Sequence, residues 1–434
     1  MDLLKKLFKG DKIVWIIFML FCLISIIEVF SASSTLTYKS GDHWRPITSH
    51  MTLIFTGTII VFFTHLMPCR WFKKLNIILL ISWALLLFLL FWGAFTNGAR
   101  RWIDMGFFQF QPSELAKMGI VIFVAYALTR FQHENGADKK AFKYIMIATL
   151  GTIMLIVTEN LSTAALIAGT VFIMMFIGRI PWKQMAYLTG ISVAAIVFAV
   201  ATIKFVPWEE MGVHRFSTWK ARIDDHLNQG EIPAAKFDID NNAQVAHANI
   251  AIATSNIVGK GPGNSVQRDF LSQAFSDFIY AIIIEELGLI GGAFVAMLYI
   301  VLLLRIGKIA RECDELFYSL LIMGIGIIIS LQAMFNMLVA VGIIPVTGQP
   351  LPLISKGGTS ILINSAYIGI ILSVSRHVYE IRAKKEEEQA MAEAQLQEKA
   401  IEILKNAALQ LAEKDLQNNK NENENTEENY NVTK

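Results

Sequence analysis

Residues 276–305 read SDFIYAIIIEELGLIGGAFVAMLYIVLLLR, and this stretch decides the class of fold. After Asp277 it is apolar for long enough to cross a hydrocarbon core of about 30 Å, which takes roughly 20 residues in a helix. Only Glu285 and Glu286 bring charge into it before Arg305. A carboxyl group where a polar loop enters a membrane is costly unless it has a task. The stretch therefore predicts a membrane helix that begins with a functional acid.

The composition extends this interpretation to the whole chain. Of the 434 residues, 54% are hydrophobic and 17% are charged, with a formal net charge of +2, whereas ordinary soluble domains are roughly a quarter charged. We predict a polytopic membrane protein without a nucleic-acid partner. Its cysteines, Cys22, Cys69 and Cys313, show no CxxC or Cys/His spacing, so the sequence predicts neither a disulfide framework nor a zinc site.

Nine further apolar segments accompany the quoted one, and together they predict an all-α fold with ten transmembrane helices. The ten segments are 13–32, 50–67, 75–94, 114–131, 144–159, 161–179, 185–206, 276–305, 318–342 and 356–378. The fifth and sixth leave room only for a very tight turn at residues 158–163. The first lacks a small-residue cleavage site, which predicts a retained helix rather than a signal peptide.

Lysine and arginine predict the orientation, because short cytoplasmic loops carry an excess of both. Every second loop is basic, beginning before the first segment and ending after the last. Both termini are therefore predicted to be cytoplasmic. The opposite face then carries the segments 32–49, 95–113, 207–275 and 343–355.

Two regions outside the ten helices need a separate interpretation. Residues 207–275 are too long for an ordinary connection, so we predict a functional extracytoplasmic loop between helices 7 and 8. Residues 1–378 would form the membrane domain, and the Ala, Leu, Glu and Lys pattern of 379–415 predicts a charged cytoplasmic helix. Residues 416–434, rich in Asn and Glu, are predicted to be a disordered tail that solubilises the protein or contacts a cytoplasmic partner.

Polar side chains gather on the predicted outer face. Glu114 and Lys117 lie three residues apart on one face of the fourth helix, and they form either a structural ion pair or part of a polar cavity. Arg100 and Arg101 precede them beside Trp102. They are either interfacial side chains or phosphate ligands, since a guanidinium group binds phosphate oxygens in bidentate fashion.

The longer loops add further candidates for substrate binding. Arg215, Arg222 and Gln244 lie in the long outer loop. Residues 342–360 contain three prolines and several glycines, so they cannot continue a helix and must line protein or water. Lys356 and Ser360 in this stretch can donate hydrogen bonds to a pyrophosphate or a sugar, and a helix-capping role explains Ser360 equally well.

Two further features lie close to Asp277 in the sequence. Glycines alternate with other residues over 259–263 and permit a close backbone approach to a ligand, but the flanking sequence is not that of a nucleotide-binding loop. Glu285 and Glu286 point about 100° apart around a helix. We do not expect them to share one role, and one should pair within the bundle.

The motifs along residues 10–378 resemble the SEDS family, which includes FtsW of cell division, RodA of elongation and SpoVE. The matching pieces are 98–103, 111–117, 163–164, 259–265, 276–278, 285–288 and 345–360. The resemblance implies a peptidoglycan glycosyltransferase that polymerises lipid II, an undecaprenyl-pyrophosphate disaccharide-peptide, with inversion at the anomeric carbon. Asp277 then occupies the position of the family's essential aspartate and is the implied catalytic base. Arg100, Lys117 and Lys356 would neutralise the pyrophosphate leaving group.

The resemblance also implies partners and a location. The partners would be lipid II, a class B penicillin-binding protein transpeptidase and other membrane proteins of the divisome. The location would be the cytoplasmic (inner) membrane at the division septum, with the active site on the extracytoplasmic face. A divalent cation, Mg²⁺ or Mn²⁺, would share the work at the pyrophosphate, although the sequence shows no site for it.

The long outer loop and the cytoplasmic extension favour the division enzyme, FtsW, within the family. A RodA-type elongation polymerase and a lipid II flippase without chemistry remain the alternatives. Departures from the family pattern leave Asp277 in place. Lys356 stands where an aromatic residue is usual, and residues 159–163, ENLST, replace the usual PDLGT.

Overall fold

The computed structural model describes residues 9–32, 45–92, 94–96, 99–104, 109–134, 136–205, 243–271 and 274–431. The helices are α2 (Lys12–Ala32), α4 (Arg45–Leu66), α5 (Ile77–Trp92), α6 (Pro112–Arg130), α7 (Lys139–Val157), α8 (Leu161–Ile177), α9 (Trp182–Phe205), α11 (Ala243–Ala253), α12 (Ile279–Arg311), α13 (Leu316–Ala340) and α14 (Gly358–Asn431). Two 3₁₀ helices, η1 (Cys69–Asn76) and η3 (Gln267–Asp269), lie between them. The chain divides into two units, Met1–His377 and Val378–Lys434.

Each of the ten predicted membrane segments overlaps one of these helices. Eight helical segments in the described part of the chain are long and apolar enough to cross a membrane: α2, most of α4, η1 with α5, α6, α7, α12, α13 and the beginning of α14. α8 is apolar but has only 17 residues, which span roughly 26 Å at about 1.5 Å per residue. A multi-pass helical membrane protein is thus confirmed, and the count of ten crossings stays a prediction.

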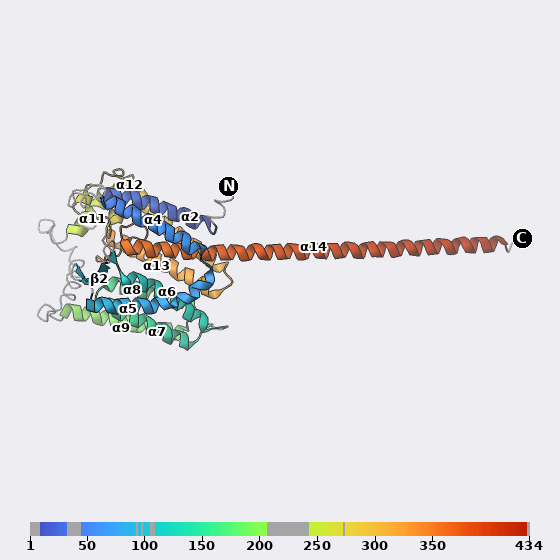
Figure 1. Cartoon of the computed structure of the whole chain (residues 1–434), viewed down its shortest axis with the longest axis horizontal. Coiled ribbons are helices and arrows are strands. Elements are labelled where there is room, and N and C mark those ends of the chain that lie inside the picture. The colour runs from blue at the N-terminus through green and yellow to red at the C-terminus, as the bar shows by residue number, and fades with distance from the viewer. Residues whose placement is uncertain are drawn as a thin grey trace. The chain divides into compact units, whose positions relative to one another are not determined.

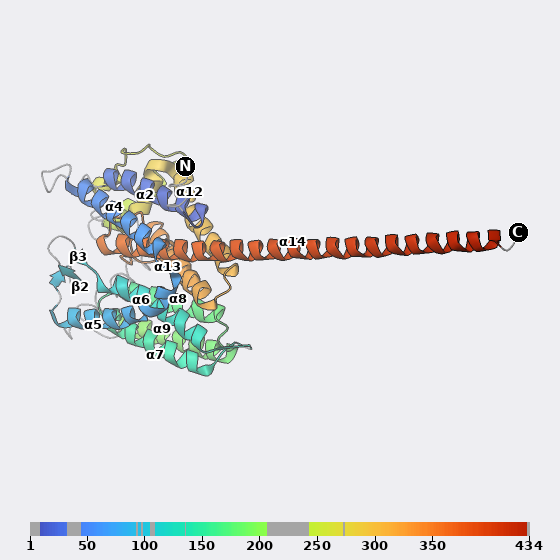
Figure 2. The ribbon, with the colours of Figure 1, turned by 45° about the vertical axis from the view of Figure 1, so that its right-hand side comes forward.

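The helices of the first unit run side by side as a bundle (Figures 1 and 2). α6 and α13 lie inside it, because most of their side chains are buried. α4 and α5 lie at its edge and expose large apolar side chains such as Phe55, Phe63, Leu80 and Phe91. Apolar residues on an outer face suit contact with lipid, so the polar chemistry of the bundle is expected on its inner helices.

Short strands add to the predicted all-α architecture. β1 (Ala94–Thr96), β2 (Ala99–Asp104) and β3 (Gln109–Phe110) form an antiparallel sheet in that order between α5 and α6, and β4 (Gln132–His133) pairs with β5 (Gly136–Ala137) between α6 and α7. Pairing between the strands satisfies main-chain polar groups in these connections. β2 lies at the same end of the bundle as α11 (Figures 1 and 2).

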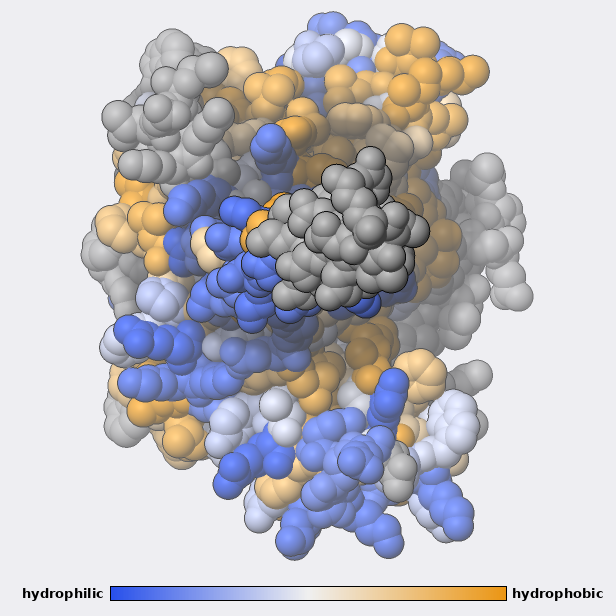
Figure 3. Space-filling view, turned by 90° about the vertical axis from the view of Figure 1, so that its right-hand side faces the viewer, coloured by the Kyte–Doolittle hydropathy of each residue, from blue (hydrophilic) through white to orange (hydrophobic). Residues whose placement is uncertain are grey.

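Basic residues gather at the opposite end of the bundle. η1 lies there and carries Lys73 and Lys74, and Lys73 Nζ forms an ion pair with Glu315 Oε2 across 2.7 Å. Hydrophilic side chains cluster on this end when it is viewed end-on, with apolar side chains around its edge (Figure 3). Lys73 and Lys74 belong to the charge pattern from which the orientation was predicted, and the orientation itself stays a prediction.

α14 runs past the predicted start of the disordered tail. The sequence predicts an end of the helix at residue 415, whereas α14 continues to Asn431. The reason is that no glycine or proline follows Gly369, so nothing in the sequence interrupts the helical backbone. The division at residue 416 is therefore not visible in the secondary structure.

Candidate active site

Asp277 lies in the turn before α12, two residues ahead of Ile279. Ser276 Oγ donates a hydrogen bond of 3.0 Å to Asp277 Oδ1. The other carboxylate oxygen faces Gly348, since a Cβ added at Gly348 would lie 3.6 Å from Asp277 Oδ2. The acid therefore points toward the loop that connects α13 to α14, residues 345–357.

This loop is bound to the turn that carries Asp277. Ser355 Oγ donates to the main-chain oxygen of Ser276 across 2.7 Å, and the main-chain nitrogen of Lys356 donates to the oxygen of Phe275 across 2.9 Å. The Lys356 ammonium group lies 5.6 Å from the centroid of the Phe275 ring. Partial burial lowers the pKa of Lys356. Asp277 and Lys356, which are 79 positions apart in the sequence, thus lie on adjoining segments.

α13 holds the two segments together through two side-chain amides. Asn336 Nδ2 donates to the main-chain oxygens of Asp277, across 2.9 Å, and of Gln349, across 2.8 Å. One turn earlier, Gln332 Nε2 donates to the oxygen of Pro350 across 2.9 Å. Both amides are buried, so they fix the position of Asp277 relative to the loop.

The predicted pair of Glu114 and Lys117 joins the same network. Lys117 Nζ lies 2.8 Å from Glu114 Oε1, and both side chains are almost completely buried. The same ammonium group donates to Gln332 Oε1 across 2.7 Å. Of the two alternatives, the ion pair is present, and through Gln332 it is connected to the loop at Pro350.

Sequence reasoning missed Gln332 and Asn336. They lie four residues apart, and therefore on one face, of the otherwise apolar α13. Polar residues inside a membrane helix usually face the protein interior and are functional, so this spacing was a usable signal. Gln349 was also missed, and its amide donates to Thr163 Oγ1 across 2.9 Å.

Other predicted residues make contacts elsewhere or lie outside the described residues. Arg101 Nε donates to the main-chain oxygen of Glu159 across 2.7 Å, in the turn between α7 and α8. Ser360 Oγ accepts a hydrogen bond from Asn364 Nδ2 within α14. Gln244 lies in the first turn of α11. Outside the described structure lie the side chain of Arg100 and the whole of Arg215 and Arg222.

Comparison with known proteins places this arrangement in a family. The sequence model of the FtsW/RodA/SpoVE family, described as "cell cycle protein", matches residues 11–380. The chain belongs to this family. Stage V sporulation protein E of Bacillus subtilis (strain 168) is 30% identical over 373 residues, which cover 85% of this chain and 97% of that protein. The probable peptidoglycan glycosyltransferase FtsW of Halomonas elongata is 29% identical over 373 residues, 84% of this chain and 90% of that protein.

Solved structures with the FtsW/RodA/SpoVE fold superimpose on most of the chain. A chain from a study of polymerization and crosslinking by a peptidoglycan synthase complex has a TM-score of 0.69 and 23% identity. The rod shape determining protein RodA of Thermus thermophilus has a TM-score of 0.60 and 22% identity. Each match covers 85% of this chain and 98% of the other. The family resemblance read from the motifs is confirmed.

Several buried polar atoms around Asp277 have no hydrogen-bond partner among the described residues. They are Asn336 Oδ1, Thr347 Oγ1 and Gln349 Oε1. Because buried polar atoms are nearly always paired, this group favours a polar ligand at the site. Within the described ranges, no three His, Cys, Asp or Glu side chains gather in a way that could hold a metal ion.

Proposed function

We propose that this chain is a peptidoglycan glycosyltransferase that polymerises lipid II, with Asp277 as its base. The observation that carries the proposal is the position of Asp277. It lies in the turn held by Asn336, its carboxylate faces Gly348, and the adjoining segment carries Lys356. Relatives named probable peptidoglycan glycosyltransferase FtsW support the reaction class.

The proposed reaction joins the 4-hydroxyl group of one sugar to the anomeric carbon of another and releases undecaprenyl pyrophosphate. A sugar hydroxyl is a weak nucleophile, and a positioned carboxylate that takes its proton raises the rate by about 10² to 10⁴. Attack from the face opposite the leaving group inverts the anomeric carbon. The Lys356 ammonium group, assisted by Arg100 and Lys117, would neutralise the charge that develops on the pyrophosphate.

The unpaired polar atoms suit the sugar part of such a substrate. The amide oxygens of Asn336 and Gln349 accept hydrogen bonds, and the Thr347 hydroxyl can donate or accept one. Sugar hydroxyls are partners for all three. Arg101, Arg215, Arg222, Gln244 and Ser360 complete the proposed set of substrate-binding residues, and a divalent cation, Mg²⁺ or Mn²⁺, would bind with the pyrophosphate.

We place the active site on the extracytoplasmic face of a ten-helix bundle whose termini are both cytoplasmic. The gathering of Lys73 and other basic residues at the end opposite β2 supports this orientation. The residues after 378 would extend into the cytoplasm. The role we propose is septal, with a class B penicillin-binding protein transpeptidase and other divisome proteins as partners, and the FtsW-named relatives favour it over a RodA-type elongation role.

The proposal is tested with the purified protein and a transpeptidase partner in lipid vesicles that contain lipid II. Gel separation of the glycan product should show polymer with the wild-type chain and none with Asp277→Asn or Asp277→Ala, while both variants still bind the partner. Asp104→Asn, which changes an exposed carboxylate on β2, should polymerise normally.

Two other results would overturn the proposal. Polymer formed by Asp277→Asn at the wild-type rate would remove Asp277 as the base. Transfer of lipid II between leaflets without any polymer from the wild-type chain would instead favour a flippase, for which the buried pair of Glu114 and Lys117 would be the polar element of the path.

A further inference from the structure

α12 is interrupted at Gly288, nine residues after its first residue, Ile279. Gly288 has φ +74° and ψ −177°, which are not helical values. The residues before the break therefore form a short helix, Ile279 to Leu287, with Asp277 just ahead of its first turn. A break of this kind frees main-chain groups that a continuous helix would pair, and inside a membrane these need other partners.

Residues 256–261 supply those partners. The main-chain nitrogens of Lys260 and Gly261 donate to the oxygens of Glu285, across 3.0 Å, and Glu286, across 2.8 Å. On the other side of the break, the nitrogens of Leu289 and Ile290 donate to oxygens of the same segment, each across 3.3 Å. The segment thus supplies hydrogen-bond partners for main-chain groups of α12 on both sides of Gly288.

The approach is so close that only glycine fits on each side. A Cβ at Gly259 would overlap the main-chain nitrogen of Gly288, and a Cβ at Gly288 would overlap the oxygen of Ile257. Both glycines have positive φ, +81° and +74°, a region that other residues rarely adopt. The spaced glycines of the sequence are therefore explained by contact with another part of the backbone.

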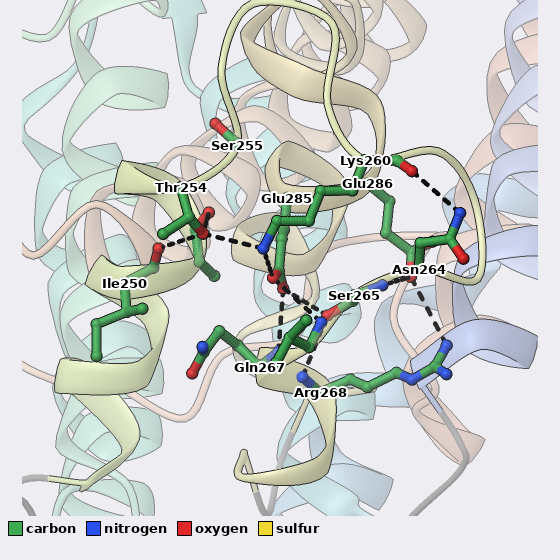
Figure 4. A network of polar contacts seen from close by, with 12 residues as sticks. Ile250, Thr254, Ser255, Lys260, Asn264, Ser265, Gln267, Arg268, Glu285 and Glu286 are labelled. Carbon is green, nitrogen blue, oxygen red and sulfur yellow. Dashed lines mark hydrogen bonds and ion pairs between the residues drawn. The ribbon is translucent and has the colours of Figure 1, made fainter.

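The side chain of Glu285 binds the continuation of the same segment (Figure 4). Its carboxylate is fully buried and accepts four hydrogen bonds, from Lys260 Nζ across 2.6 Å, Ser265 Oγ, Val266 N across 3.2 Å and Gln267 N across 3.3 Å. These four donors replace the water molecules that the carboxylate loses on burial.

The side chain of Glu286 binds the same segment from the neighbouring side of the helix. It is also fully buried and accepts from Gly263 N across 2.9 Å, Ser265 N across 3.2 Å and the Ser31 hydroxyl of α2. Arg268 Nη1 lies 3.9 Å away. The two glutamates, which the sequence predicts to have separate roles, thus bind one segment, 260–268, which wraps across both of their faces.

We propose that Glu285 and Glu286 are positioning residues for Asp277. Their hydrogen bonds attach the C-terminal end of the short helix 279–287 to the segment 256–268, and we call this attachment the lock. Asn336 holds the turn with Asp277 at the N-terminal end of the same helix. Fixed at both ends, this helix sets the place of the carboxylate relative to the acceptor hydroxyl. The inference rests on the proposed function of Asp277, because it assigns a purpose to the lock only if Asp277 is the base.

Kinetics of lipid II polymerisation by the full chain with its transpeptidase partner test the inference. A displacement of about 1 Å at a reacting group lowers a rate by up to 10²-fold, so Glu285→Ala and Glu286→Ala should lower kcat by about 10- to 100-fold, with KM changed less than about threefold. Glu285→Gln keeps the shape and one acceptor oxygen and should restore part of kcat. Gly288→Ala should lower kcat similarly, because it breaks the lock without touching a carboxylate.

Gly307→Ala is the matched control on the same helix. A Cβ at Gly307 meets nothing within 4 Å, so this variant should keep the wild-type kcat. Wild-type kcat per folded molecule in the glutamate variants and in Gly288→Ala would overturn the inference, as would an equal loss in Gly307→Ala. No polymer from the wild-type chain would instead refute the proposed function.

Hydrogen exchange gives a readout that does not depend on activity. In Glu285→Ala and Glu286→Ala, amides of residues 274–287 should exchange at least about tenfold faster than in the wild type, while those of α13 keep their rates. Unchanged exchange over 274–287 would show that the glutamates do not hold this helix, and the inference would fail whatever the reaction is.

Discussion

The side-chain amide of Asn336 donates a hydrogen bond of 2.9 Å to the main-chain oxygen of Asp277. The same nitrogen donates to Gln349, so one buried amide joins the turn before α12 to the loop after α13. Removing it leaves two buried carbonyl oxygens without this donor, and each unpaired oxygen lowers the stability by about 1–3 kcal/mol.

Asn336→Ala is therefore expected to lower the free energy of unfolding by a few kcal/mol on this scale and to reduce kcat more than it raises KM. Thermal unfolding in detergent and polymerisation kinetics measure the two effects. Asn336→Asp should behave in the same way, because a carboxylate of the same shape cannot donate. If either variant kept wild-type kcat and stability, the amide would not be holding the turn.

The pair of Glu114 and Lys117 gives a second prediction. Both side chains are almost completely buried, and removing one member of such a pair leaves an uncompensated charge, which costs about 3–5 kcal/mol. Lys117→Met should be destabilised by this amount in a chemical or thermal unfolding experiment.

The double variant Glu114→Gln with Lys117→Met serves as the control, since it removes both charges. It should recover much of the lost stability, because well-matched neutral residues often replace a buried pair without loss. It should not recover polymerisation if Lys117 assists the pyrophosphate. Equal stability of the single and double variants would contradict a coupled pair.

Local patterns in the sequence predicted the helices and Asp277, and contacts between distant residues made up most of what they missed. Apolar length identified the ten long helical segments of the bundle, because a membrane helix satisfies its own backbone, but it did not identify α11, which lies in the predicted outer loop. The bond from Lys117 to Gln332 could not be predicted in this way, since Gln332 lies 215 positions away. The contact of Glu285 and Glu286 with one segment was hidden for the same reason. Helix periodicity separates their faces, and only the folded segment 256–268 brings them together.

The pH dependence of Lys356 gives a third prediction. Burial lowers its pKa, so the positive charge is lost at a lower pH than for an ordinary lysine, whose pKa is about 10.4. Because the charged form is needed to neutralise the charge that develops on the leaving pyrophosphate, kcat/KM for lipid II should fall as the pH increases through this lowered value.

Lys356→Arg separates this effect from other alkaline changes, because a guanidinium group stays charged throughout the accessible range. In this variant the fall of kcat/KM should move to higher pH, and Lys356→Met should show a lowered kcat/KM at every pH. If the kinetics changed with alkaline pH in the same way in the wild type and in Lys356→Arg, Lys356 would not be the group that causes the change.

Close packing between α5 and α6 gives the fourth prediction, which concerns stability alone. A Cβ at Gly119 would lie 2.8 Å from Leu79 Cα and 2.9 Å from Leu79 N, and main-chain atoms cannot move aside as a flexible side chain can. Gly119→Ala should therefore force the helices apart and lower the free energy of unfolding by about 1–3 kcal/mol or more, the usual range for overpacking.

Gly169→Ala on α8 is the matched control, since its Cβ would lie 3.8 Å from Leu331 Cδ1, an ordinary contact. There the better helix propensity of alanine should leave stability unchanged or raise it by up to about 1 kcal/mol. Thermal unfolding of both variants under the same conditions measures the difference in their stability. If Gly119→Ala were as stable as Gly169→Ala, α5 and α6 would have room to separate, and the contact at Leu79 would not limit their approach.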